Sequence, residues 1–216
     1  MIDILIAYHE ALGKGIVVTL KICAYVWGIG IVYGVIFAFI GHKYIYVRKI
    51  FSVFSFILGG IPVLILLFWF HYPFQSLMGV VIDPFYTTIF CLGLVNIFIV
   101  FSLISKELMQ IDKEYGQIAK VFGNSIYKIF FHIELPLVFK RNISPILLAQ
   151  VNMMHMSLFG SIISVNEILR VAHQINSISY QTIEIYTIVG VIFLLISLPL
   201  NGIALLLNKR YNYVSR

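Results

Sequence analysis

The sequence FYTTIFCLGLVNIFIVFSLIS, residues 85–105, contains no charged residue. One helix needs about 20 mostly apolar residues to cross a bilayer core about 30 Å thick, so this stretch predicts a transmembrane helix. Four further stretches meet the same criterion: residues 15–40, 50–70, 143–163 and 183–207. The sequence therefore predicts an all-α fold, a membrane bundle of five transmembrane helices that forms a single domain over residues 1–216.

The composition of the whole chain excludes the soluble classes of protein. Apolar residues make up 61% of the sequence and charged residues 11%, whereas a soluble chain carries about 25% charged residues. A secreted domain, a soluble enzyme and a disordered tail are therefore ruled out. Cys23 and Cys91 both lie in apolar stretches, so we expect small buried hydrophobes and neither a disulfide nor a metal site.

The positions of the cations orient the helices, because Lys and Arg keep the loops that carry them on the cytoplasmic side. Twelve of the 15 Lys and Arg residues lie between spans one and two, between spans three and four, or after span five. The opposite side carries Arg170 as its one clear loop cation. We therefore expect the N-terminus outside and the C-terminus inside, and we interpret the net charge of +6 as topology, not as a nucleic-acid-binding surface.

The inner segment 106–141 is too long for a tight turn and too polar to lie within the membrane. Its apolar residues recur at steps of three and four, which predicts helices with one apolar stripe. Gly123 can end a first helix, Asn124 or Ser125 can cap a second, and we expect Pro136 to terminate it. By periodicity alone, an amphipathic helix pair resting on lipid headgroups is an equally good interpretation.

The order of residues in this segment resembles a family motif. Gly123, nine further residues, and then Ile133-Glu134-Leu135-Pro136 are similar to the cytoplasmic motif of binding-protein-dependent ABC transporter permeases. That motif reads E-A-A, three residues, G, nine residues, I-x-L-P, and it forms a coupling helix that docks on an ATPase subunit. The resemblance implies that the ATPase-coupling residues are Gln117, Ala119, Gly123, Asn124, Ser125 and Pro136. Gln117 replaces the family's glutamate, so a salt bridge of that glutamate is lost.

Four further stretches, in the right order, resemble the polar amino acid branch of that family, namely its histidine and lysine/arginine/ornithine permeases. They are residues 15–21, 58–64, 166–181 and 186–199. Some polar groups of the branch are missing here: its box arginine in span two is Gly59, and residues 154–158 replace its span-four K-D-T-S-L. This loss favours a heterodimer in which this chain is the less polar half, with a homodimer as the alternative.

The resemblance implies one part of a larger importer in the bacterial cytoplasmic membrane, which carries polar amino acids, with basic ones favoured. The implied partners are two ATP-binding cassette ATPase subunits, a second permease subunit, an extracytoplasmic substrate-binding protein and the lipid bilayer, and no nucleic acid. This chain lacks the G-x-x-x-x-G-K-[ST] loop, so we expect ATP and Mg on the ATPase subunits. We expect this chain to be no enzyme and to hold no cofactor.

Polar or helix-weakening residues inside the spans are the candidates for a substrate path, because a polar group in hydrocarbon is costly unless it faces helices or water. The candidates are Gly59, Gly60 and Pro62 in span two and Asn152, His155 and Ser157 in span four. The span-two residues weaken the helical hydrogen-bond ladder and so can expose backbone groups to a cavity. The alternatives are a simple kink in span two and structural hydrogen bonds between helices in span four.

Glu167 and Arg170 lie at the outer end of span four. The resemblance places them in the outer gate, and their three-residue spacing also permits the two side chains to pair with each other.

The alternative function is a haem-binding membrane anchor of a redox complex. His71, His155 or His173 would then ligate the haem, but only His155 lies well inside a predicted span. An ion channel is less well supported, because the chain has neither a repeated carbonyl filter nor an acidic ring.

Overall fold

A computed structural model describes residues 2–111 and 125–212, and each regular element in these two ranges is a helix. The chain divides into two compact units. Unit 1 comprises Met1–Trp27, Ile61–Gly93 and Val151–Pro199, and unit 2 comprises Gly28–Gly60, Leu94–Gln150 and Leu200–Arg216. The predicted all-α fold is confirmed, whereas the single predicted domain contains two compact units.

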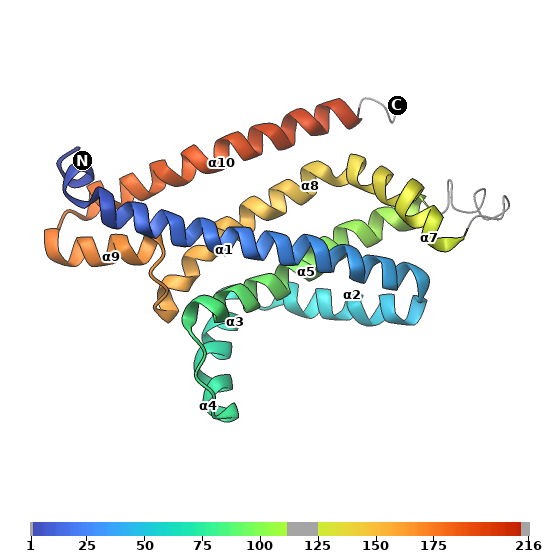
Figure 1. The fold of residues 1–216 in the computed structure, drawn as a ribbon, viewed down its shortest axis with the longest axis horizontal. Coiled ribbons are helices and arrows are strands. Elements are labelled where there is room, and N and C mark those ends of the chain that lie inside the picture. Colours follow the sequence, from blue (N-terminus) through green and yellow to red (C-terminus); the bar gives the residue numbers. More distant parts are fainter. Residues whose placement is uncertain (1, 112–124, 213–216) are drawn as a thin grey trace. The chain divides into compact units, whose positions relative to one another are not determined.

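Four helical runs among the described residues are long and apolar enough to cross a membrane (Figure 1). They are α1 (Ile2–Lys43), α5 (Pro84–Ile111), α10 (Thr182–Asn212) and a composite run. The composite run consists of α7 (Ile126–Ile129), the π-turn η3 (Phe130–Glu134), α8 (Leu135–Met156) and the 3-10 turn η4 (Ser157–Ile163). Predicted span one lies within α1, span three within α5, span four within the composite run and span five within α10. The composite run begins well before predicted span four and ends with it at Ile163, and the other runs extend beyond the predicted bounds at both ends.

The second predicted span is broken in its middle. α2 (Ile45–Gly60) ends at the glycine pair, and α3 (Val63–Trp69) leads through the π-turn η1 (Phe70–Phe74) into α4 (Gln75–Met78). Pro62 causes the break, because it has no N–H and disfavours a helical conformation at the residue before it. Its carbonyl starts α3 by accepting bonds from the Ile65 and Leu66 N–H groups at 2.9 and 3.1 Å. Counted as one span, the pair is a fifth candidate.

A further helix, α9 (Ile168–Ser179), lies in unit 1 where the sequence analysis assigned no element. Its buried residues are Ile168, Val171, Ala172 and Ile175, a helical spacing that the sequence displays. α9 packs on α1, since a Cβ at Gly15 would lie 2.9 Å from the Ile168 Cα, and Thr19 Oγ1 accepts the Ile168 N–H at 3.3 Å. In the same unit, Cys23 and Cys91 are buried free thiols, as predicted.

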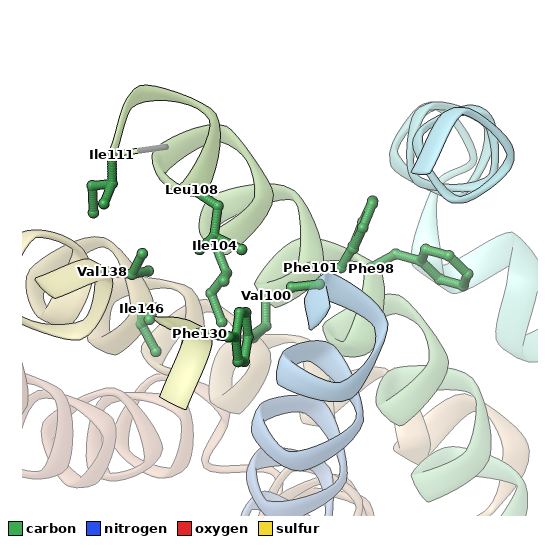
Figure 2. Packing of buried hydrophobic residues seen from close by; sticks show 10 residues of the cluster. Phe98, Val100, Phe101, Ile104, Leu108, Ile111, Phe130, Val138 and Ile146 are labelled. Atoms are coloured by element: carbon green, nitrogen blue, oxygen red, sulfur yellow. The ribbon is translucent and has the colours of Figure 1, made fainter. Parts of the chain in front are cut away.

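The apolar core of unit 2 lies along one face of α5. Phe98, Phe101, Ile104 and Leu108 recur at steps of three or four and are almost completely buried. Figure 2 shows this row together with Phe130 of the π-turn and two residues of α8, Val138 and Ile146. The segments on both sides of residues 112–124 are therefore fixed by a common core.

α1 approaches α5 closely within unit 2, because α1 has glycine at two positions one turn apart. A Cβ at Gly34 would lie 2.7 Å from the Val100 side chain, and a Cβ at Gly30 would overlap the Asn96 side chain. Asn96 itself is fully buried and pairs with Gln150 of α8. Its Nδ2 donates to Gln150 Oε1 at 2.8 Å, and Gln150 Nε2 donates to Asn96 Oδ1 at 3.3 Å. Small residues and paired amides of this kind are what join helices in a bilayer.

We expect Gly30→Ala to lower the melting temperature of the purified protein in detergent, because the added methyl group displaces Asn96 and weakens its amide pair. Overpacking and a strained hydrogen bond together correspond to about 1–3 kcal/mol. Gly28→Ala is the matched control on the same helix, because a Cβ there meets nothing within 4 Å. Equal melting temperatures for the two variants would contradict this packing.

Candidate coupling and translocation sites

The predicted coupling segment is described only at its two ends. α5 continues to Ile111, and the chain is described again from Ser125, so Gln117, Ala119, Gly123 and Asn124 lie outside the described residues. Ser125 is exposed and stands before α7. Its Oγ accepts the Lys128 N–H at 3.4 Å and its carbonyl accepts the Ile129 N–H at 3.0 Å. Ser125, one of the two capping residues that the sequence offers, thus begins the second helix.

Pro136 does not end that helix, and the predicted termination is wrong. The helical run continues from α7 through η3 and α8 to Met156. The reason is the π-turn, in which the Leu135 N–H reaches back five residues to the Phe130 carbonyl. Pro136 is then the second residue of α8, directly after the π-turn, whose wider spacing accommodates a residue without an N–H.

An ion pair joins α5 to α8 on the two sides of this segment. Arg141 Nη1 lies 3.2 Å from Glu107 Oε1, and the two side chains are 30% and 17% exposed. Partial burial makes such a pair stronger than one on an open surface. From the sequence, Arg141 contributed only to the count of cations that orients the helices, and its contact with Glu107 was not predicted.

A cleft of about 910 Å³ lies between α2 and α5 in unit 2. It is lined by the cations Arg48, Lys49 and Lys106, by Ser52, Ser55, Ser102 and Ser105, and by Gly59 and Gly60 together with apolar side chains. The structure thus brings two of the predicted path residues, Gly59 and Gly60, into the lining of this cleft. The serines were missed as a group, although each pair is three residues apart on its helix, the spacing of one helical face. Hydroxyl groups and cations at this position suit a polar solute that bears a carboxylate.

The three candidates of span four differ in exposure. Asn152 and His155 are exposed on α8, and the His155 ring centroid lies 5.9 Å from that of Phe193. Ser157, in contrast, is completely buried, and its Oγ donates to the Met154 carbonyl at 2.7 Å. Within this chain, Asn152 and His155 are accessible to a solute or a partner, and Ser157 is a structural residue.

Glu167 and Arg170 are close together, but the contact is between the carboxylate and the backbone. Glu167 is completely buried and caps α9 by accepting the Leu169 and Arg170 N–H groups at 2.9 and 2.8 Å. The Arg170 guanidinium instead donates from Nη1 to the Ser161 carbonyl at 3.3 Å. Burial raises the pKa of the Glu167 carboxyl from 4.5 to about 7, and the two backbone N–H bonds only partly oppose that rise.

The three histidines named for the haem alternative have other neighbours. His71 Nδ1 lies 3.3 Å from Thr87 Oγ1 and 3.1 Å from Gln75 Nε2, and the His173 ring centroid lies 5.8 Å from that of Tyr186. None of these contacts favours haem ligation.

Known proteins resemble this chain over most of its length. The arginine transport system permease protein ArtQ of Bacillus subtilis (strain 168) is 26% identical over 196 residues, which cover 88% of this chain and 87% of that protein. A crystal structure of an amino acid ABC transporter with histidines has a TM-score of 0.83 at 20% identity and covers 95% of this chain and 96% of that one. An inward-facing structure of the MetNI methionine ABC transporter has a TM-score of 0.72 at 16% identity, with 93% and 98% covered. At these identities the solved structures establish the fold.

The family match covers residues 30–213, which include α2, α5, the coupling segment, α8 and α10. The family is described as "Binding-protein-dependent transport system inner membrane component". The chain therefore belongs to this family and is a multi-pass transmembrane permease subunit of an ABC importer in the cytoplasmic membrane.

Proposed function

We propose that this permease subunit moves a polar amino acid into the cell, with arginine and related basic amino acids as the first substrates to test. The observation that carries the proposal is the 26% identity to an arginine permease over nearly the full length of both chains. The cleft between α2 and α5 supports a polar solute with a carboxylate, since its cations can attract an α-carboxylate and its serines can replace water around polar groups. The basic side chain of the substrate rests on the sequence identity alone.

We propose that the chain acts within an assembly of two ATPase subunits, a second permease subunit and an extracytoplasmic binding protein. ATP and Mg bind to the ATPase subunits, which perform the hydrolysis. The second permease is a related chain, because this one lacks several polar groups of its branch, and an identical chain is the alternative. The cation-rich segments lie inside the cell, with the N-terminus outside and the C-terminus inside.

The coupling segment 106–141 receives the mechanical input in this proposal. The ATPase subunits dock on its central part, which includes Gln117, Ala119, Gly123, Asn124 and Ser125, and closure of the ATPase dimer displaces the segment. The Glu107–Arg141 ion pair joins α5 and α8 on the two sides of that part, so the displacement moves both helices. Because α5 also lines the cleft, the displacement changes access to it.

The substrate path runs past Gly59, Gly60 and the break at Pro62, with Asn152 and His155 as polar contacts. Glu167 and Arg170 belong to the outer gate in this proposal, where the binding protein docks.

The test of the function is transport by the reconstituted importer. Proteoliposomes contain the permease together with its ATPase and its partner permease. Labelled arginine and the binding protein are added on one side of the membrane and ATP on the ATPase side, and uptake of the label is measured. We expect ATP-dependent uptake that unlabelled basic amino acids compete with. If only neutral or acidic amino acids compete with the uptake, the proposed basic substrate is wrong. If no ATPase binds to the permease, the proposed assembly is wrong.

We expect Gly59→Leu to reduce transport severalfold without a change in melting temperature. A Cβ at Gly59 meets nothing within 4 Å, so the larger side chain enters the open cleft and obstructs it. Gly202→Leu is the control, because a Cβ added at Gly202 also meets nothing within 4 Å and Gly202 does not line the cleft. Normal transport by Gly59→Leu would contradict the assignment of the cleft to the path.

The raised pKa of Glu167 predicts a pH-dependent stability of the outer segment. Between pH 4.5 and about 7, the Glu167 carboxyl group is protonated in the folded state and ionised in the unfolded state. The free energy of unfolding therefore falls as the pH rises through this window. The full effect is roughly 3 kcal/mol. In detergent, the melting temperature of the wild type should fall more between pH 5 and 8 than that of Glu167→Gln, which keeps an oxygen for the cap but does not titrate. Glu184→Gln is the control, and identical pH profiles for wild type and Glu167→Gln would contradict the prediction.

A further inference from the structure

A buried contact between an imidazole and a carboxyl group joins the inner end of α1 to the π-turn η3, which lies within the coupling segment. His42, next to the last residue of α1, places Nε2 3.2 Å from Glu134 Oε2. The side chains are 7% and 0% exposed, and both residues belong to unit 2. Glu134 occupies the variable position of the I-x-L-P motif, to which the family resemblance assigns no role.

The carboxyl group of Glu134 has few polar partners in this conformation. Among the described residues, none donates a hydrogen bond to either of its oxygens, so the 3.2 Å approach of His42 Nε2 is its closest polar contact without hydrogen-bond geometry. A buried carboxyl group with so few partners is costly, and its energy depends on the position of the His42 ring. A small displacement of η3 relative to the end of α1 would therefore change the energy of the pair substantially.

Neighbouring aromatic contacts place the same two segments against each other. Phe39, one turn before His42, has ring-centroid distances of 4.7 Å to Phe130 and 5.4 Å to Tyr127. Lys43 Nζ donates to the Tyr127 hydroxyl at 3.1 Å. The aromatic rings bury apolar surface between the two segments, and the His42–Glu134 contact is the buried polar contact beside them.

We propose that His42 and Glu134 are positioning residues whose buried contact makes the inner end of α1 follow the displacement of the coupling segment. ATP-driven movement of that segment then reaches α1 as well as α5 and α8. This inference rests on the proposed function, because it requires that an ATPase acts on the coupling segment.

The test compares stability with coupling in the complete importer in proteoliposomes. Glu134→Gln removes the carboxyl group and keeps the size of the side chain. The double variant His42→Phe/Glu134→Leu replaces the pair by apolar groups, an exchange that is commonly neutral or stabilising when both partners are replaced. His132→Gln is the control, since His132 lies on the same π-turn but is exposed. The measurements are the melting temperature, the amount of bound ATPase, and the number of substrate molecules transported per ATP hydrolysed.

We expect the double variant to keep its melting temperature and its bound ATPase while transport per ATP falls roughly fivefold or more, the size of a typical coupling between sites. Glu134→Gln should show the same loss, and the control should match the wild type. If the double variant transports as many molecules per ATP as the wild type, the pair is only structural and the proposal is wrong. A wild-type complex whose ATPase does not respond to substrate would instead refute the proposed function itself.

Discussion

The reciprocal amide pair of Asn96 and Gln150, packed against Gly30, is the interaction on which the arrangement of unit 2 depends. Apolar helices gain little from burying apolar surface against one another in a bilayer, because lipid is equally apolar. Close approach and hydrogen bonds must therefore hold α1, α5 and α8 together, and these residues supply both. The cleft beside α5 and the contacts His42–Glu134 and Glu107–Arg141 involve the same helices.

The helix interruptions mark the places where the chain departs from simple membrane spans. The break at Pro62 follows the two glycines that line the cleft, and the π-turn η3 carries Glu134 within the coupling segment. Regular helices satisfy their own backbone groups in the membrane, so each interruption has a cost that packing or polar contacts must offset. One interruption lies next to the cleft and the other next to the buried His42–Glu134 contact, and these positions agree with the proposed solute path and coupling segment.

The sequence was sufficient for the spans, because a run such as residues 85–105 has no alternative to a helix in lipid. Local chemistry also located the interruption of span two at Gly59, Gly60 and Pro62, and it offered Asn124 or Ser125 as the cap of the second helix. Pro136 was misjudged, since a π-turn that makes room for proline leaves no local signal. The pairs Asn96–Gln150, Glu107–Arg141 and His42–Glu134 could not be predicted either, because they join residues that only the tertiary fold brings together.

In the proposed function, the segment 106–141 docks on an ATPase subunit and receives the force of ATP hydrolysis. Ser125→Cys tests this docking directly, because Ser125 is exposed and the natural cysteines, Cys23 and Cys91, are buried. In membranes that contain the whole importer, a short reagent that reacts with a thiol at one end and with an amine at the other should cross-link this cysteine to a lysine of the ATPase subunit, with a yield that changes when ATP is added. An intact complex in which Ser125→Cys gives no cross-link to the ATPase, with or without ATP, would contradict the account.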